Sequence, residues 1–362
     1  MLTQRPFQIA CSACSAGAGA QADHPPHHHE MSVTPIGKQL VDFRERVQQV
    51  KRQLEDGQVS IQCNKKRGLH GGEVDTDVSL AGRLLAAQFP QWADLPIEPV
   101  ASAGTDNALY RLGGDMVVRL PRIEWAVESV DREHRWLPRL APLLPVAIPV
   151  PLGRGRPAEG YPWPWSVYRW LEGGNPAIDR LADPGLLARD LAEFIAALRG
   201  IDPTDGPPAG RSGPLAMRDA PTRSAIEALR GMVDTGALTA AWDAALRTPG
   251  WPGAPVWVHS DLAPGNVLLV NGRLSAVIDF SGLGVGDPAC DVPVAWNLLP
   301  AGTRNVFRAA LRVDDATWAR GRGWALSVAL IQLPYYRDTN PVLAANARHV
   351  IHEVLADHKH GA

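Results

Sequence analysis

The sequence has few cysteines, no long hydrophobic run and almost no imbalance of charge. Its 362 residues include four cysteines, too few for a disulfide framework, which is typical of a reducing compartment. The longest uncharged apolar stretch, residues 141–153, contains four prolines and is too short to cross a bilayer. The formal net charge of -2 does not favour a nucleic-acid partner. We therefore expect a cytoplasmic protein, monomer or homodimer, that binds neither nucleic acid nor membrane.

The first 68 residues differ in character from the rest of the chain. Residues 1–33 mix Ala, Gly, Ser, Pro and His without a period, which predicts disorder. Residues 34–68 are interpreted as an amphipathic helical extension, because apolar residues recur at alternating spacings of 3 and 4 from Leu40 to Leu54. Such a helix could dock a partner, pack on its own domain, or come from an upstream start codon and have no role.

Residues 75–172 read as a small lobe of strands and one main helix. Three short strands follow one another in PVASAG, ALYRL and MVVRLP, with a Gly-Gly turn between the second and third. Val127, Val130, Leu137 and Leu140 then mark a helix, which is followed by the apolar runs VAIPV and WSVYRWL. The pattern predicts a small antiparallel sheet.

Residues 173–357 are mostly helical by the same criteria. The clearest helix runs from 186 to 199 and ends at Gly200. A β-hairpin interrupts the helices, because VLLV and RLSAVIDF flank the turn signal Asn271-Gly272. The predicted fold class is therefore α+β, with a small sheet lobe and a larger helical lobe that carries the hairpin.

The strongest chemical signal is the run HSDLAPGN together with IDF at the exit of that hairpin. Asp261 stands two residues after His259, Asn266 five after Asp261, and Asp279 thirteen after Asn266. A carboxylate and an amide on a rigid loop, with a second carboxylate brought alongside by the hairpin, can hold Mg²⁺ through oxygen ligands and leave one Asp for a hydroxyl. This combination suits phosphoryl transfer.

These residues resemble the catalytic and metal-binding loops of the aminoglycoside phosphotransferase family, small-molecule kinases with a protein-kinase-like fold. The resemblance spans roughly residues 75–357. It implies that Asp261 accepts the proton of the substrate hydroxyl, that Asn266 and Asp279 hold Mg²⁺, and that His259 braces the loop. It also implies ATP or GTP as the co-substrate.

The resemblance implies a nucleotide site in the small lobe, with one departure from the family pattern. Arg119 in MVVRLP stands where the family has a lysine that contacts the phosphates, and arginine differs from lysine in reach and shape. We expect Glu133 to pair with Arg119, with Glu128 as the second candidate. Either glutamate could instead be a solvated charge on the helix.

Two further segments complete the predicted nucleotide site. The loop from Ser102 to Asn107, with Gly104 and Thr105, occupies the place of the phosphate-covering glycine loop, although it contains a single glycine. The segment with Tyr168 and Trp170 would be the hinge, whose backbone commonly binds a purine. Its aromatic side chains could equally belong to the core.

The acceptor is the least determined part of the prediction. Asp291 could shape the acceptor site, although capping the helix at VPVAWNLL is favoured. Residues 283–362 carry seven acidic and eight basic side chains, so no acidic excess indicates a polycationic substrate. The predicted function is Mg²⁺-dependent transfer of the γ-phosphate of ATP or GTP to a hydroxyl of a small molecule, such as an aminoglycoside or another sugar-bearing antibiotic. The alternative is a non-catalytic nucleotide-binding module whose N-terminal helix docks a partner.

Overall fold

The described part of the chain begins shortly after the predicted extension. The computed structural model describes residues 73–102, 104–211 and 213–360. The chain divides into two units, residues 1–67 and 68–362, and all the described residues belong to the second. The segments predicted as disordered (1–33) and as an amphipathic helix (34–68) lie outside the described residues.

The smaller lobe is built on a five-stranded antiparallel sheet with the strand order β1-β2-β3-β5-β4. Its strands are β1 (Ile97–Pro99), β2 (Asn107–Leu112), β3 (Met116–Pro121), β4 (Pro151–Gly155) and β5 (Trp165–Arg169). In the turn between β2 and β3, Gly113 has a φ of +58°, a left-handed conformation that glycine adopts without strain. The antiparallel strands predicted in ALYRL and MVVRLP are confirmed as β2 and β3, with the Gly-Gly turn between them. The first predicted strand, PVASAG, is wrong, because β1 ends at Pro99, and the run VAIPV ends just before β4.

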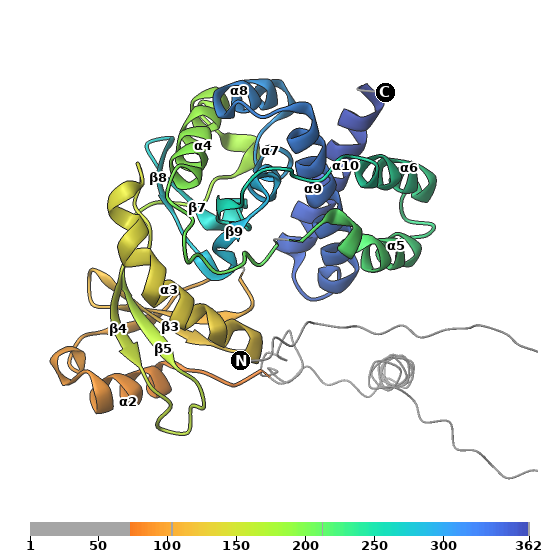
Figure 1. Cartoon of the computed structure of the whole chain (residues 1–362). Coiled ribbons are helices and arrows are strands. Elements are labelled where there is room, and N and C mark those ends of the chain that lie inside the picture. The colour runs from red at the N-terminus through yellow and green to blue at the C-terminus, as the bar shows by residue number, and fades with distance from the viewer. Residues whose placement is uncertain (1–72, 103, 212, 361–362) are drawn as a thin grey trace, which may run out of the picture. The chain divides into compact units, whose positions relative to one another are not determined.

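Two helices pack with this sheet (Figure 1). They are α2 (Val78–Gln88) and α3 (Val127–Leu140), with short 3₁₀ turns η1 (Pro90–Trp92), η2 (Glu124–Ala126) and η3 (Ala141–Leu143). The Asp77 side chain caps α2 by accepting a hydrogen bond from the Leu80 amide at 2.7 Å. The predicted apolar face of α3 is buried at Val130, Leu137 and Leu140.

The larger lobe consists mainly of helices, which gather at the other end of the described unit in Figure 1. They are α4 (Pro184–Arg199), α5 (Asp219–Ala228), α6 (Thr235–Leu246), α7 (Val294–Asn297), α8 (Ala301–Leu311), α9 (Asp315–Tyr336) and α10 (Pro341–His360). Short turns η4 (Ile178–Arg180), η5 (Leu215–Arg218), η6 (Pro264–Asn266), η7 (Phe280–Gly282) and η8 (Pro288–Asp291) connect them. The helix predicted over 186–199 is α4, and its apolar face is buried.

Two small antiparallel pairs of strands lie within the helical lobe. The first joins β6 (Val256–Val258) to β9 (Gly284–Gly286), and the second is the hairpin of β7 (Val267–Val270) and β8 (Arg273–Val277). At the tip of the hairpin Asn271 and Gly272 both have positive φ, +51° and +78°, as a type I′ turn requires. The hairpin predicted from the Asn-Gly pair is therefore confirmed.

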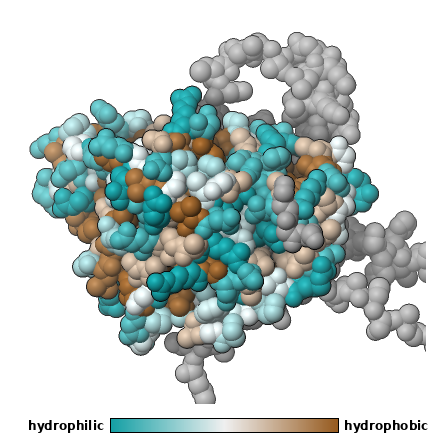
Figure 2. Space-filling model, turned by 90° about the horizontal axis from the view of Figure 1, so that it is seen from above, coloured by the Kyte–Doolittle hydropathy of each residue, from teal (hydrophilic) through white to brown (hydrophobic). Residues whose placement is uncertain are grey.

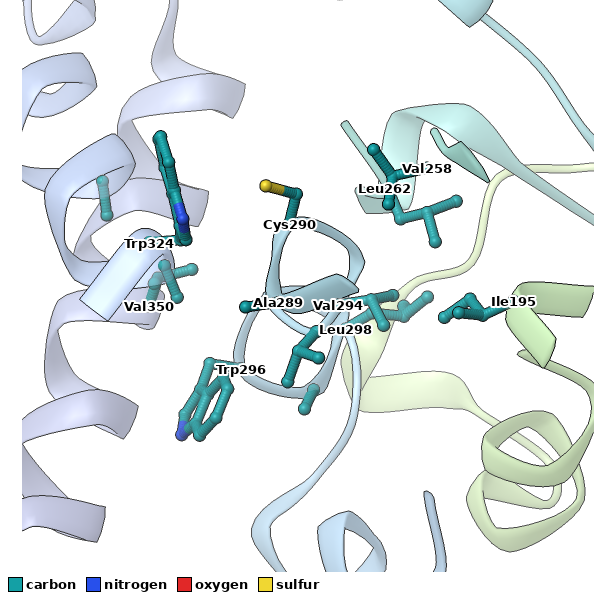
Figure 3. Packing of buried hydrophobic residues seen from close by; sticks show 14 of the residues in the cluster. Ile195, Val258, Leu262, Ala289, Cys290, Val294, Trp296, Leu298, Trp324 and Val350 are labelled. Carbon is teal, nitrogen blue, oxygen red and sulfur yellow. The ribbon is translucent and has the colours of Figure 1, made fainter. Parts of the chain in front are cut away.

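The core of the helical lobe surrounds the chain that follows the hairpin. Figure 3 shows Cys290 and Val294 between Trp324 of α9 on one side and Ile195 of α4 on the other. Trp296 and Trp324 are 0% and 3% exposed, so these aromatic residues pack the core. Burial of this chain from both sides fixes the position of η8, which supports the site described below.

The surface of the described unit is mixed in character. On the face shown in Figure 2, hydrophobic residues occur in small groups among hydrophilic ones. Scattered exposed apolar side chains are normal for folded proteins. No helix among residues 73–102, 104–211 and 213–360 is both long enough and apolar enough to cross a membrane.

Gly284 in β9 allows a close approach that a side chain would prevent. A Cβ atom there would lie 2.5 Å from the Ala209 nitrogen and 2.5 Å from the Pro207 oxygen. We expect Gly284→Ala to reduce the free energy of unfolding by roughly 1–3 kcal/mol in urea denaturation. Gly302→Ala in α8 is the matched control, because no atom lies within 4 Å of the added carbon. Equal losses in the two variants would contradict this account.

Candidate active site

The candidate catalytic loop follows β6 and is anchored by the buried carboxylate of Asp291. Asp291 is 0% exposed and accepts hydrogen bonds from the backbone amides of His259, at 3.0 Å, and Ser260, at 2.7 Å. Ser260 has a φ of +65°, so the loop turns sharply just before Asp261. The buried carboxylate therefore satisfies the hydrogen-bonding capacity of two amides in a strained turn, and it fixes the backbone position of the next residue, Asp261.

The placement of Asp291 corrects both sequence predictions for it. Its full burial and its hydrogen bonds to the catalytic loop leave it no contact with an acceptor, and it does not cap a helix. Asp287 caps η8 instead, by accepting from the Ala289 amide at 2.8 Å, and also pairs with Arg320 at 2.7 Å. The GDPACD pattern alone could not separate the two aspartates, because each lies where a cap is plausible.

His259 connects the catalytic loop to the strand that leads to Asp279. Its imidazole Nδ1 accepts a hydrogen bond from the Asp261 amide at 3.2 Å, and its Nε2 lies 3.1 Å from the Ile278 carbonyl oxygen. These partners assign the proton to Nε2, which donates to that carbonyl. The ring is fully buried and packs edge-on against Phe280. His259 therefore stabilises the conformation of the loop, and its buried ring is not placed to contact a ligand.

Asp261 and Asn266 lie on one short loop and contact each other. The Asn266 side-chain amide donates to the Asp261 carbonyl at 2.8 Å and to its carboxylate at 3.3 Å. The Asp261 side chain remains 37% exposed. The Ile278 amide donates to the Asn266 carbonyl at 2.9 Å, which ties the loop to the residue before Asp279. The structure thus brings the three predicted oxygen-bearing side chains to one region.

Asp279 follows β8 in a left-handed conformation, with φ 61° and ψ 73°. Its side chain is 37% exposed, and its Oδ1 atom accepts from Arg119 at 2.9 Å. Burial opposes its ionisation, but the Arg119 guanidinium and hydrogen bonds from Ser281 outweigh burial and hold the pKa of Asp279 below its usual value. The carboxylate is therefore ionised at neutral pH, as a metal ligand must be.

Arg119 of β3 connects the two lobes through carboxylates. It donates to both Glu133 oxygens, at 2.7 and 2.8 Å, and to Asp279. With its amide oxygen turned toward the guanidinium, Asn107 accepts from Arg119 at 2.9 and 3.2 Å. Burial disfavours the charged guanidinium, but Glu133 and Asp279 raise the pKa of Arg119 above its usual value. The predicted Arg119–Glu133 pair is confirmed, and Glu128 is exposed.

The predicted phosphate-covering loop contacts the other lobe. The Gly104 amide donates to the Ser102 side chain at 3.0 Å, so a local turn shapes the loop. The Thr105 hydroxyl donates to Asp106 at 2.8 Å and lies 3.4 Å from the Tyr336 hydroxyl of α9. Thr105 is 5% exposed. This loop of the small lobe and α9 of the helical lobe are therefore in contact.

The two aromatic residues of the predicted hinge, Tyr168 and Trp170, have different surroundings. The Tyr168 side chain is 3% exposed and donates its hydroxyl hydrogen to Glu133, so it belongs to the core, which is the second of the two roles considered for it. Contact of the hinge backbone with a purine stays a prediction. The Trp170 ring packs 3.9 Å from the Arg111 guanidinium, and no described residue pairs with its buried indole nitrogen. Trp170 remains the predicted hinge contact, with an unsatisfied donor.

Sequence reasoning missed two side chains that contact the site or its supports. Arg211 lies 2.7 Å from Asp261 and donates to the Ser260 carbonyl. Asp190 of α4 accepts from Arg273 at 2.8 and 2.9 Å and from the Leu274 amide at 3.2 Å, which anchors the hairpin that carries Asp279. Neither residue lies in a recognisable motif, and each finds its partner at least 49 residues away.

The donor set fits Mg²⁺ bound jointly with phosphates. No described residue donates to Asn266 Oδ1, and the Asp279 carboxylate is partly exposed, so both oxygens can serve as ligands. Among the described residues there is no group of three or more His, Cys, Asp or Glu side chains that could hold a metal. Mg²⁺ commonly binds through one or two carboxylates and takes its other ligands from phosphates and water. The pair is typical of such a site.

Comparison with a protein-family model identifies the class of protein to which this site belongs. The chain matches the phosphotransferase enzyme family over residues 97–324, which is more than half of its length, and it therefore belongs to that family. It is a phosphotransferase. No curated protein matches the chain.

Solved structures with the same fold include antibiotic phosphotransferases. An aminoglycoside phosphotransferase in complex with GDP and kanamycin is 20% identical, with a TM-score of 0.61, and the match covers 76% of this chain and 98% of that one. A macrolide 2'-phosphotransferase from Brachybacterium faecium is 24% identical, with a TM-score of 0.52 and coverage of 76% and 97%. At these identities the likeness shows the protein-kinase-like fold, which confirms the predicted fold class.

Asp190 provides a test of how the hairpin is held. Burial raises its pKa, but hydrogen bonds from Arg273 and Leu274 outweigh burial and lower the pKa below its usual value. Such an acid stabilises the fold above its unfolded-state pKa of about 3.9, and this contribution is lost as the pH falls through the folded-state value. We expect Asp190→Asn to cost roughly 1–3 kcal/mol at pH 7 and progressively less below about pH 4.

Urea denaturation at several pH values measures this difference. Asp179→Asn is the matched control, because Asp179 is 79% exposed and pairs only loosely with Arg180 at 3.9 Å. A cost of Asp190→Asn that stays constant from pH 7 to pH 3 would show that the carboxylate charge does not anchor the hairpin.

Proposed function

We propose that the protein transfers the γ-phosphoryl group of ATP or GTP to a hydroxyl group of a small molecule, in a reaction that depends on Mg²⁺. One observation carries the proposal: Asp261 and Asn266 contact each other on one loop, and Asp279 is held beside them by Arg119 from the opposite lobe. Transfer of a phosphoryl group requires mainly positioning and charge stabilisation, which such a fixed constellation supplies.

Each side chain has a defined part in the reaction. Asp261 accepts the proton of the acceptor hydroxyl as the hydroxyl oxygen bonds to the γ-phosphorus and the bond to the bridging oxygen breaks. Asn266 and Asp279 would hold Mg²⁺, which when bound neutralises charge on the phosphates. Arg119 orients Asp279 and presents positive charge toward the nucleotide, while His259 and Asp291 keep the catalytic loop in place.

The acceptor is proposed to be a hydroxyl-bearing, sugar-like molecule. Structures with this fold include phosphotransferase complexes with kanamycin, gentamicin and streptomycin, and a macrolide 2'-phosphotransferase. Tyr335 of α9 is 51% exposed beside Tyr336, which offers an aromatic face for a sugar ring. A cytoplasmic location remains a prediction from the low cysteine content.

A second candidate is a nucleotide-binding module without catalysis. The observation in its favour is Arg119 in the place of lysine, engaged by Glu133 and Asp279. Against it stands the exposed carboxylate of Asp261, which a module that only binds nucleotide does not need. The partner-docking helix of this alternative lies outside the described residues.

Replacement of Asp261 tests the catalytic proposal. Asp261→Asn removes the proton acceptor while keeping the side-chain shape, so we expect nucleotide affinity to remain and phosphoryl transfer to fall by about 10²- to 10⁴-fold. Transfer is measured by mass spectrometry as the gain of one phosphate on members of a library of hydroxyl-bearing compounds. Asp315→Asn, at a side chain 99% exposed, is the control and should keep full activity. Unchanged turnover in Asp261→Asn would remove the proposed mechanism.

The metal requirement separates the two candidates. Nucleotide should raise the melting temperature of the wild-type protein more with Mg²⁺ than with EDTA, because the phosphates and the Asn266–Asp279 pair share the ion. In Asp279→Asn the Mg²⁺-dependent part of this shift should be mostly lost. Stabilisation by nucleotide that is equal with and without Mg²⁺ would favour the non-catalytic module.

A further inference from the structure

The segment that carries Arg211 and the catalytic loop are joined at a single backbone oxygen. The Gly210 amide donates to the Gly282 carbonyl at 2.9 Å, and the Ser260 hydroxyl donates to the same oxygen at 2.8 Å. A carbonyl oxygen has two lone pairs and can accept both hydrogen bonds. The residue before Arg211 and the residue before Asp261 are therefore tied to the same atom.

The two segments also approach each other closely enough to require glycine. A Cβ atom at Gly210 would lie 3.3 Å from the Gly282 Cα atom, and one at Gly282 would lie 2.4 Å from the Ser260 Oγ atom. On the other side, the Cys290 thiol donates to the Arg211 carbonyl. The backbone at Arg211 is thus fixed by the fold before its side chain makes any contact.

The Arg211 guanidinium binds both the backbone and the side chain of the catalytic loop. Its Nη2 atom lies 2.7 Å from Asp261 Oδ1, and its Nη1 atom donates to the Ser260 carbonyl. The planar guanidinium presents its donors in a fixed fork. One side chain therefore sets the orientation of the Asp261 carboxylate relative to the backbone of the residue before it.

The two carboxylate oxygens of Asp261 have different partners. Oδ1 faces the cationic Arg211 at 2.7 Å, whereas Oδ2 accepts from the neutral Asn266 amide at 3.3 Å. Hydrogen bonds from charged donors are shorter and roughly twice as strong as those between neutral groups. The carboxylate is therefore held at Oδ1, and Oδ2 is the oxygen more available to a ligand.

We propose that Arg211 is the positioning residue of the phosphoryl-transfer site, which holds Asp261 by Oδ1 so that Oδ2 receives the proton of the acceptor hydroxyl. This role rests on the proposed function, because it assigns Asp261 as the proton acceptor. It is carried by the contact of Arg211 with Asp261 and by the backbone bonds that fix Arg211 beside the loop. A side chain 50 residues before Asp261 thus completes the catalytic loop.

The reaction step balances with Arg211 unchanged. The hydroxyl oxygen of the acceptor bonds to the γ-phosphorus, and its proton passes to Asp261 Oδ2. The bond from the γ-phosphorus to the bridging oxygen breaks, and the nucleoside diphosphate leaves with that electron pair. Arg211 gives up no proton, because a guanidinium stays charged in proteins. Its contribution is to orient the carboxylate, which is a contribution to kcat.

Substitution of Arg211 tests this role through a split between kcat and KM. The rate is the release of ADP or GDP from the Mg²⁺-nucleotide, with water as the acceptor or with a compound that the library screen shows to be phosphorylated. We expect Arg211→Gln to lower kcat about ten- to a hundredfold, because a charge-assisted hydrogen bond to the proton acceptor is lost. The KM for nucleotide should stay within about twofold of the wild-type value.

A double-mutant cycle distinguishes positioning of Asp261 from general support of the fold. In the Asp261→Asn background no carboxylate remains to be oriented, so Arg211→Gln should change kcat less than about twofold. Equal losses of kcat from Arg211→Gln in the wild-type and Asp261→Asn backgrounds would show that Arg211 does not act through Asp261. That result would overturn the proposal.

Chemical rescue gives a second readout that a merely structural role would not move. Millimolar methylguanidinium should raise the kcat of Arg211→Ala, because the free cation can occupy the place of the missing guanidinium beside Asp261. Tetramethylammonium at the same concentration, which has no N–H donors, should not. Equal effects of the two cations would contradict a hydrogen-bonded contact.

A matched arginine controls for the loss of a partly exposed ion pair. Arg308 of α8 is 30% exposed, close to the 27% of Arg211, and pairs with Asp315, so Arg308→Gln should keep the wild-type kcat. Melting temperatures show whether each variant is folded. If Arg211→Gln does not fold, the cycle is repeated with Arg211→Lys, which keeps the charge without the fork and should lose less kcat.

The same measurements separate this role from the proposed function. A wild-type protein that releases no nucleoside diphosphate and phosphorylates no compound would contradict the proposed function itself. Normal turnover by the wild type together with an unchanged kcat in Arg211→Gln would overturn the role of Arg211 alone.

Discussion

The contact between Arg119 and two carboxylates is the constraint on which the candidate site depends. Arg119 extends from the sheet, binds Glu133 of α3 within its own lobe, and reaches Asp279 in the other lobe. A buried guanidinium is tolerated only if its donors are satisfied, so the position of Asp279 relative to the sheet is restricted. Tyr168, by donating to Glu133, extends the same network into the core of the small lobe. Arg119 thus joins the two lobes.

The catalytic loop is held in another way, by hydrogen bonds that satisfy its buried backbone amides. Asp291 accepts hydrogen bonds from two amides of a turn in which Ser260 has positive φ. Its neighbours Cys290 and Val294 pack between α4 and α9 (Figure 3), which holds this part of the chain in place. Because the loop is anchored through its backbone, the Asp261 side chain remains available for chemistry. Asp190 anchors the hairpin that leads to Asp279 in the same way, by accepting a hydrogen bond from the Leu274 amide.

Arg211 gives the catalytic loop a charged contact that lies outside the HSDLAPGN run. Its guanidinium lies 2.7 Å from Asp261 and donates to the Ser260 carbonyl. The backbone before Arg211 is held along β9, because the Ala209 amide donates to the Val285 carbonyl and the Gly210 amide to the Gly282 carbonyl. The charge next to Asp261 is thus set by a segment that is distant in the sequence.

Local patterns in the sequence determined most of the secondary-structure elements and identified the candidate catalytic residues. The Asn271-Gly272 turn requires positive φ, the period of α4 selects its buried face, and the spacing from Asp261 to Asn266 places both on one loop. Tertiary structure alone decided that Arg211 meets Asp261 and that Asp291 supports the loop instead of the acceptor. The reason is physical: a turn or a helix face depends on neighbours a few residues away, whereas a buried ion pair or an anchoring carboxylate depends on which distant segments pack together.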